Sequence, residues 1–263
     1  MSKPSGAIDM TQGKPINLML RFALPMMIGS IFQSLYSMVD SAVLGRFVGS
    51  HALAAIGATT STTGLILLLA TGVTSAVSIV LSQYVGANDT DRVRKGIVAS
   101  GWITLLLGIV LGLISVFAAR PLMQLLKTPE DVIDMSVLYI QIVCGCGIAQ
   151  FAYNAAASIL RALGDSKTPL YFLILCSILN VILDLISVIG LNMGVAGVAV
   201  ATVGSQAISA AICILVMFRK YPDLMPKRHT LRPDMPVSLK IFGMGAQMAL
   251  QSLFLSVGMM VIT

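Results

Sequence analysis

The stretch that decides the fold is residues 96–118, GIVASGWITLLLGIVLGLISVFA, which carries no charged side chain along its whole length. A helix needs about 20 mostly apolar residues to cross a hydrocarbon core about 30 Å thick, because each residue advances the helix by about 1.5 Å. In lipid the backbone polar groups find no partner outside the chain, so such a run folds as a membrane-spanning helix. The stretch therefore predicts a helical membrane protein.

Similar apolar runs lie on both sides of this stretch. We expect spans near 16–44, 52–82, 96–118, 134–160, 168–190 and 194–218, and a seventh run opens near 237. Composition agrees, since 57% of the residues are hydrophobic and 11% are charged, whereas soluble domains have roughly 45–50% and about 25%. We predict an all-α polytopic membrane protein that forms a six-helix transmembrane bundle, with part of a seventh helix.

The polar segments divide the chain into four parts. We expect a cytoplasmic tail over 1–15, the bundle over 16–218, a proline-rich and charged cytoplasmic linker over 219–236, and the first helix of a second bundle over 237–263. The last part resembles the first span in character at an offset of about 220 residues, which favours two parallel repeats. On this interpretation the chain is a fragment of a longer protein.

Basic residues indicate the orientation, because short loops that are rich in Lys and Arg stay in the cytoplasm. With a cytoplasmic N-terminus, fourteen of the 17 Lys and Arg residues fall on the cytoplasmic side, and only Arg46, Arg120 and Lys127 fall on the other. We therefore expect a multi-pass protein of the plasma or inner membrane with its N-terminus inside. The net charge of +6 is accounted for by these loops, so it does not indicate a nucleic-acid partner.

Two carboxylates, Asp40 and Asp184, lie within or at the edge of the apolar spans, where an unpaired charge is costly. Polar residues recur around them at steps of three and four residues, so each set occupies one helix face. The three sets are Ser30, Gln33, Ser37 and Asp40; Ser177, Asn180, Asp184 and Ser187; and Thr202, Ser205, Gln206 and Ser209. Carboxylate, amide and hydroxyl oxygens suit a small hard cation or a proton. The alternative is that the carboxylates make ordinary interhelical or interfacial contacts and the serines only pack.

Two features of the spans predict helix shape and packing. Pro25 removes a backbone hydrogen bond inside the first span and should kink it. Gly108 and Gly112 form a small-residue motif that predicts a close helix contact.

Four stretches together carry a family resemblance that covers the whole chain. They are FQSLYSMVDSAVLGRFVG at 32–49, SQYVGANDTDRVRKG at 82–96, RALGDSKTP at 161–169 and LNVILDLISVIGLNMGVAGVAVAT at 179–202. With them the sequence resembles the multidrug and toxic compound extrusion (MATE) family, in its DinF-like branch. The resemblance implies two six-helix bundles that open alternately to either side of the membrane, exchanging Na⁺ or H⁺ for amphipathic, often cationic compounds.

The resemblance also implies particular site residues. Carried over position by position, the cation site comprises Asp40, Asn180, Asp184 and Thr202. The expected substrate-cavity contacts are Gln33, Tyr36 and Ser37. We expect no catalytic residue, no cofactor besides the coupling ion, and no metal beyond Na⁺. The expected partners are the lipid bilayer, small amphipathic substrates, and either a second copy of this chain or a C-terminal half.

Three alternative functions remain open from the sequence. A lipid-linked oligosaccharide flippase of related fold should line its cavity with Arg and Lys, and the centres of the spans hold none. An intramembrane prenyl or phosphatidyl transferase should carry paired Asp-rich motifs for Mg²⁺, and no span contains one. The third alternative is a remnant that does not transport.

Overall fold

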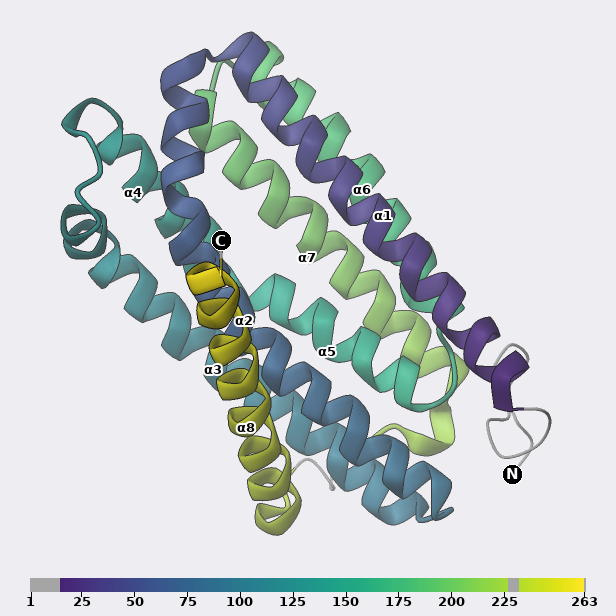
Figure 1. The fold of residues 1–263 in the computed structure, drawn as a ribbon. Helices are drawn as coiled ribbons and strands as arrows, with labels where there is room; N and C mark the ends of the chain where they lie inside the picture. The colour runs from purple at the N-terminus through teal and green to yellow at the C-terminus, as the bar shows by residue number, and fades with distance from the viewer. Residues whose placement is uncertain (1–14, 227–231, 263) are drawn as a thin grey trace.

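The computed structural model describes residues 15–226 and 232–262, and these form helices joined by short turns (Figure 1). The α-helices are α1 (Pro15–Phe47), α2 (Ser50–Gly86), α3 (Thr90–Leu125), α4 (Glu130–Gly145), α5 (Ile148–Ala162), α6 (Lys167–Asp184), α7 (Gly194–Lys220) and α8 (Met235–Ile262). A π-helix, η1 (Leu185–Gly190), continues α6, and a short 3₁₀ turn, η2 (Pro222–Leu224), follows α7. The expected all-α fold is confirmed.

The described residues hold five or six candidate spans. Five helical stretches are long and apolar enough to cross a membrane, and α4 with α5, bent by 43°, makes a sixth if the pair is counted as one span. The span expected over 134–160 is therefore divided into two helices. Gly145, Cys146 and Gly147 interrupt it, because two glycines within three residues weaken a helix interior.

The break between α4 and α5 packs against the paired glycines of α3. A Cβ atom on Gly108 would come within 2.9 Å of Ile148 Cγ1, and one on Gly112 within 2.9 Å of the Gly145 carbonyl oxygen. Only a residue without a side chain allows these approaches, so the predicted close helix contact is confirmed.

Helix α6 packs against both α1 and α7, and Figure 1 shows it behind α1. The largest apolar cluster joins α2, α3, α5, α7 and α8, with Leu81, Leu160, Cys213 and Ile241 fully buried. Large apolar side chains such as Leu113 and Phe117 are 54% and 79% exposed. In a membrane-spanning bundle these exposed side chains face lipid.

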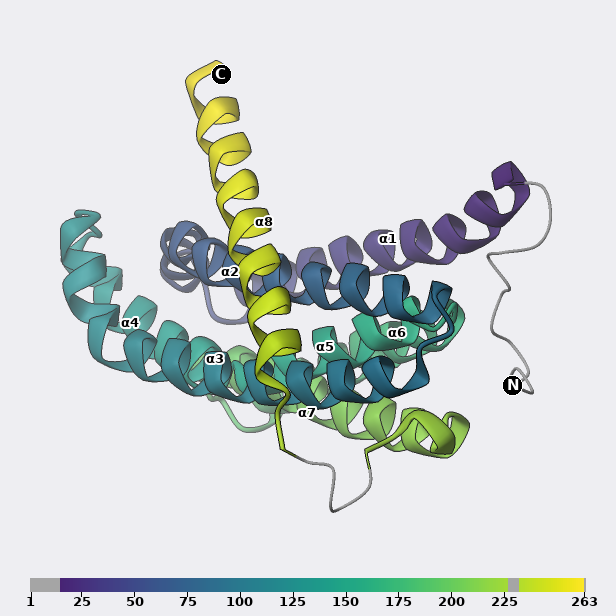
Figure 2. The same cartoon turned by 90° about the horizontal axis from the view of Figure 1, so that it is seen from below.

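Helix α8 packs on α2 and α3 and rises steeply past them, so its C-terminal end extends beyond the other helices (Figure 2). Its backbone approaches α2 closely, since a Cβ atom on Gly72 would lie 2.8 Å from the Ala249 nitrogen. Lys240 Nζ donates a hydrogen bond to Gln83 Oε1 at 3.1 Å. The helix expected to open a second bundle is thus attached to the first.

The expected tail and linker are only partly described. Residues 1–14 of the tail 1–15, and residues 227–231 of the linker, lie outside the described residues. The helices reach slightly into the linker expected over 219–236, because α7 continues to Lys220 and α8 begins at Met235. Arg94 Nε donates to the Asp223 carbonyl oxygen at 2.7 Å, which attaches the start of the linker to α3.

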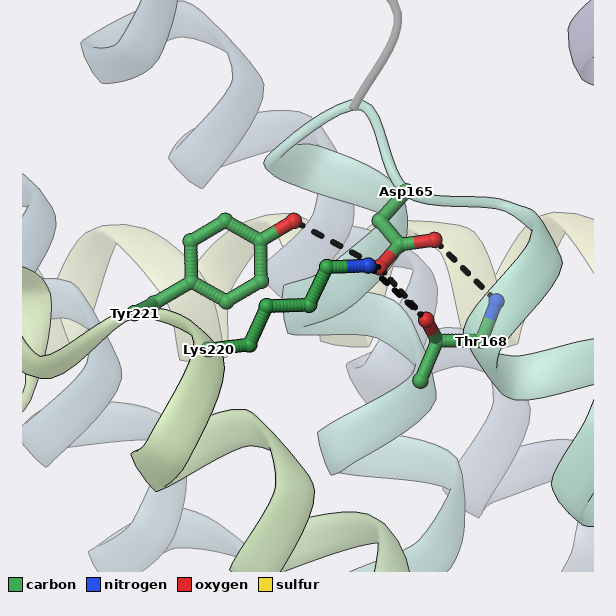
Figure 3. Close-up of polar contacts among 4 residues, drawn as sticks. All are labelled: Asp165, Thr168, Lys220 and Tyr221. Atoms are coloured by element: carbon green, nitrogen blue, oxygen red, sulfur yellow. Dashed lines mark hydrogen bonds and ion pairs between the residues drawn. The ribbon is translucent and has the colours of Figure 1, made fainter. Parts of the chain in front are cut away.

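The turn between α5 and α6 places a buried carboxylate beside the end of α7 (Figure 3). Gly164 takes φ +83°, its N–H donates a hydrogen bond to the Arg161 carbonyl oxygen, and the Asp165 N–H donates to the Leu160 carbonyl oxygen. This is a Schellman motif, which favours glycine because the backbone is left-handed at that position. It ends α5 and brings Asp165 to the first turn of α6.

The Asp165 carboxylate, which is 1% exposed, accepts hydrogen bonds from the first turn of α6 and from the end of α7 (Figure 3). Lys220 Nζ lies 2.7 Å from Asp165 Oδ2, and Thr168 Oγ1 donates to the same oxygen at 2.6 Å. The Thr168 N–H donates to Oδ1 at 3.1 Å, and the Tyr221 hydroxyl donates to Oδ2 at 3.4 Å. Burial alone would raise the pKa of the Asp165 carboxyl, but the Lys220 and Thr168 hydrogen bonds outweigh burial and lower that pKa below its ordinary value of 3.8. We call Asp165, Thr168, Lys220 and Tyr221 the α6–α7 clamp.

The close approach of α2 and α8 predicts a position-specific effect of added volume. We expect Gly72→Val to lower the free energy of unfolding by about 1–3 kcal/mol, because the side chain would collide with the Ala249 backbone. Thermal unfolding in detergent measures the change. Gly64→Val on the same helix is the matched control, since a Cβ atom there meets nothing within 4 Å. Equal midpoints for the two variants would contradict the contact.

Candidate cation site

The four expected cation-site residues converge from three helices. Asn180 and Asp184 lie on α6 and are 1% and 0% exposed, and Thr202 lies on α7 and is 7% exposed. Asn180 Nδ2 and Thr202 Oγ1 are 3.5 Å apart. Asp40, on α1, is partly buried, and its carboxyl group interacts electrostatically with that of Asp184. The structure therefore brings together residues 40, 180, 184 and 202.

In the part of the chain that the structure describes, several buried side-chain oxygens at this point have no hydrogen-bond partner. They are Asp40 Oδ1, Asn180 Oδ1, and both Asp184 Oδ1 and Oδ2. A buried polar atom without a partner costs about 1–3 kcal/mol, and more if it is charged. Such a group of unsatisfied acceptors is the arrangement that a proton or a hard cation would stabilise.

A π-helix begins directly after Asp184. Residues Leu185–Gly190 widen the helix, and this turn contacts α7, where a Cβ atom on Gly197 would lie 3.1 Å from Ser187 Oγ. Single π turns inside α-helices are rare and occur often at functional sites. The polar spacing of the sequence does not reveal this change, because steps of three and four residues fit a regular α-helix.

Two tyrosines also border the acidic pair. The hydroxyl groups of Tyr36 on α1 and Tyr139 on α4 interact electrostatically with Asp40, and Tyr139 interacts with Asp184 as well. Tyr36 was expected in the cavity, whereas Tyr139 was missed. The only signal for Tyr139 is an isolated phenol in an apolar span, since a buried hydroxyl usually needs a partner.

The remaining expected residues of α1 lie away from the buried pair. Gln33 and Ser37 are exposed, and the Ser37 hydroxyl donates to the Gln33 carbonyl oxygen. Serines 30, 177, 187 and 205 likewise donate to their own helix backbone. These hydroxyls are satisfied locally, so the packing interpretation fits them better than ligation. Pro25 is buried and α1 continues through it as one helix, so the kink stays a prediction.

The donor set limits the chemistry. Among the residues that the structure describes, no three His, Cys, Asp or Glu side chains group as metal ligands. The converging groups are two carboxylates, an amide and a hydroxyl, all oxygen donors toward a cation. Such groups fit Na⁺ or a proton, and thiolate or imidazole groups that would favour a softer metal do not join them.

Comparison with known proteins gives a family. The MatE family model matches residues 25–186. "Probable multidrug resistance protein YpnP" of Bacillus subtilis is 32% identical over 258 residues, which cover 97% of this chain and 57% of the relative. "Multidrug export protein MepA" of Staphylococcus saprophyticus is 23% identical, over 91% of this chain and 53% of its own length. A crystal structure of MATE in the bent conformation matches with a TM-score of 0.86 at 25% identity, over 94% of this chain and 55% of that one. The chain spans about half the length of the curated relatives it matches.

The unsatisfied oxygens predict a cation-dependent stability. We expect added Na⁺ at alkaline pH, or mild acidification, to raise the thermal midpoint of the wild-type chain, because a ligand that binds only the folded state stabilises it. Asp184→Asn should abolish this response. Choline chloride controls for ionic strength. Asp134→Asn is the matched variant, since that carboxylate is 79% exposed and pairs with Arg120 at the surface. An unchanged response in Asp184→Asn would rule out this site.

Proposed function

This chain belongs to the MATE family of transporters, and from that premise we propose that it carries the cation-coupling half of a secondary active antiporter. The antiporter exports small amphipathic compounds in exchange for Na⁺ or H⁺. The observation that carries the proposal is the pair Asp40 and Asp184, of which Asp40 Oδ1 and both Asp184 oxygens are buried without a hydrogen-bond partner among the described residues of a membrane-spanning bundle. The assignment to the DinF-like branch stays an interpretation of the sequence.

The acidic pair supplies a physical reason for coupling. A carboxylate in the membrane interior is costly unless an ion, a proton or a partner neutralises it. Asp40 lies on α1 and Asp184 on α6, so a cation between them favours the arrangement in which the two helices are close. A ligand can shift a conformational equilibrium only through its different affinities for the two states. Cation binding would therefore favour one access state, and the exported compound would favour the other.

The exposed polar face of α1 is the proposed substrate side. Gln33 and Ser37 face outward from the described bundle, and Tyr36 lies between that face and the acidic pair. A second bundle, related to the first by an axis along the membrane normal, would complete the cavity on this side. That bundle would come from a second copy of the chain or from a C-terminal half.

Reconstitution tests the proposal. We expect the chain in proteoliposomes to export a fluorescent cationic dye when a Na⁺ or H⁺ gradient is imposed, and Asp184→Asn to reduce efflux to the rate of protein-free liposomes. Asp134→Asn should transport as the wild type does. Gradient-driven efflux that survives in Asp184→Asn would refute the coupling site. If folded wild-type chain, judged by its cooperative thermal unfolding, exports nothing under either gradient, the half-length chain does not transport alone.

We also propose that the N-terminus is cytoplasmic, on the charge distribution of the loops. In a Cys146→Ser background the other three cysteines are buried, so an introduced surface thiol is the reactive one. Ala87→Cys, in the α2–α3 turn, should react with a membrane-impermeant maleimide only after the membrane is opened. Glu130→Cys, at the start of α4, should react in intact cells. The reverse pattern would overturn the orientation.

A further inference from the structure

The α6–α7 clamp and the candidate cation site join the same two helices at opposite ends. Helix α6 carries Thr168 in its first turn and Asn180 about 18 Å further along, at about 1.5 Å per residue. Helix α7 runs the other way, with Thr202 near its start and Lys220 at its end. Any slide of α6 along α7 would therefore displace both contacts together.

The clamp is the strong contact of the two. At the site, Asn180 Nδ2 and Thr202 Oγ1 are 3.5 Å apart, which is long for a hydrogen bond. One turn from the site toward the clamp, Cys176 Sγ and Ser205 Oγ lie 3.8 Å apart, a weak thiol contact. At the clamp, a charge-assisted bond of 2.7 Å and a hydroxyl bond of 2.6 Å meet on one buried oxygen of Asp165. Charge-assisted bonds of this length are about twice as strong as neutral ones.

The clamp is also anchored to the rest of the bundle. Just past Lys220, the Asp223 carbonyl oxygen accepts the Arg94 Nε–H from α3 at 2.7 Å. At the other side, the Schellman turn at Gly164 holds Asp165 at the end of α5. The end of α7 and the start of α6 are thus attached to a common frame, whereas the helix ends near Asp184 meet through the π-helix and small residues.

We infer that Asp165, Thr168 and Lys220 are positioning residues for the cation site, because they set the register in which Asn180 lies opposite Thr202. The inference rests on the cation site proposed above. A binding site whose ligand atoms are displaced by about 1 Å loses much of its affinity, so a loosened register should weaken cation binding without removing any ligand. None of the three residues touches the cation.

Cation titration of the purified full chain tests the inference. By calorimetry we expect Lys220→Met to weaken Na⁺ binding by about tenfold, the order of a typical coupling between two sites. Thr168→Val, which keeps the ion pair, should weaken it less and provides a second variant if Lys220→Met fails to fold. Lys220→Arg should retain the wild-type affinity.

Lys95→Met is the matched control, since Lys95 pairs with Asp91 and Asp234 and joins neither α6 nor α7. If the coupling ion is a proton, the same variants are compared by proton titration. The quantity compared is then the pH midpoint of the titration step that Asp184→Asn abolishes.

A double-mutant cycle separates positioning from simple loss of stability. If Lys220 acts through the Asn180–Thr202 contact, Lys220→Met should change the affinity little in a Thr202→Val background, because coupled residues are not additive. Equal affinity of wild type and Lys220→Met, with only a lower unfolding midpoint, would overturn the inference and leave the proposed function intact. Absence of any Asp184-dependent titration in the wild type would instead refute the cation site, and the positioning role with it.

Discussion

The structure depends on how a bundle in lipid tolerates carboxylates that it has removed from water. Asp184 is fully buried with both oxygens unsatisfied, and Asp165 is almost as deeply buried but accepts hydrogen bonds from Lys220, Thr168 and Tyr221. A satisfied buried charge fixes a structure, whereas an unsatisfied one creates an affinity for whatever can satisfy it. The two aspartates therefore suit different roles: Asp165 holds the helices together, whereas Asp184 is the residue that we propose to bind a cation.

Helix α6 connects the two aspartates, because Asp165 lies in the turn just before it and Asp184 is its last residue. It contacts α1 through the acidic pair and α7 through Asn180 and Thr202, and its first turn is held at the clamp. The π-helix that follows Asp184 is a local departure from regular geometry beside the unsatisfied oxygens. The helix is thus held by short hydrogen bonds at its first turn and has irregular geometry just beyond the proposed cation site.

Several features could be predicted from the sequence because they depend on local composition. Apolar runs of membrane length fix the number of spans, and the small residues Gly108 and Gly112 mark the close contact of α3. The clamp was not predicted. Asp165 and Lys220 are 55 residues apart, and each lies in a polar loop or helix end, where a charge needs no special explanation. Tyr139 was missed for the same reason, since nothing in its own span shows which helix it faces.

The sequence by itself determined that this protein is an all-α membrane bundle with two intramembrane carboxylates, because the hydrocarbon core selects helices by length and polarity alone. Only the tertiary structure decided which polar groups meet. It separated Asp165, which accepts hydrogen bonds from Lys220 and Thr168, from Asp184, whose oxygens meet no such donor among the described residues, and it broke the fourth span at Gly145. Helical periodicity gives the face on which a residue lies, but the partner depends on how the helices pack around one another, and that is a property of the whole chain.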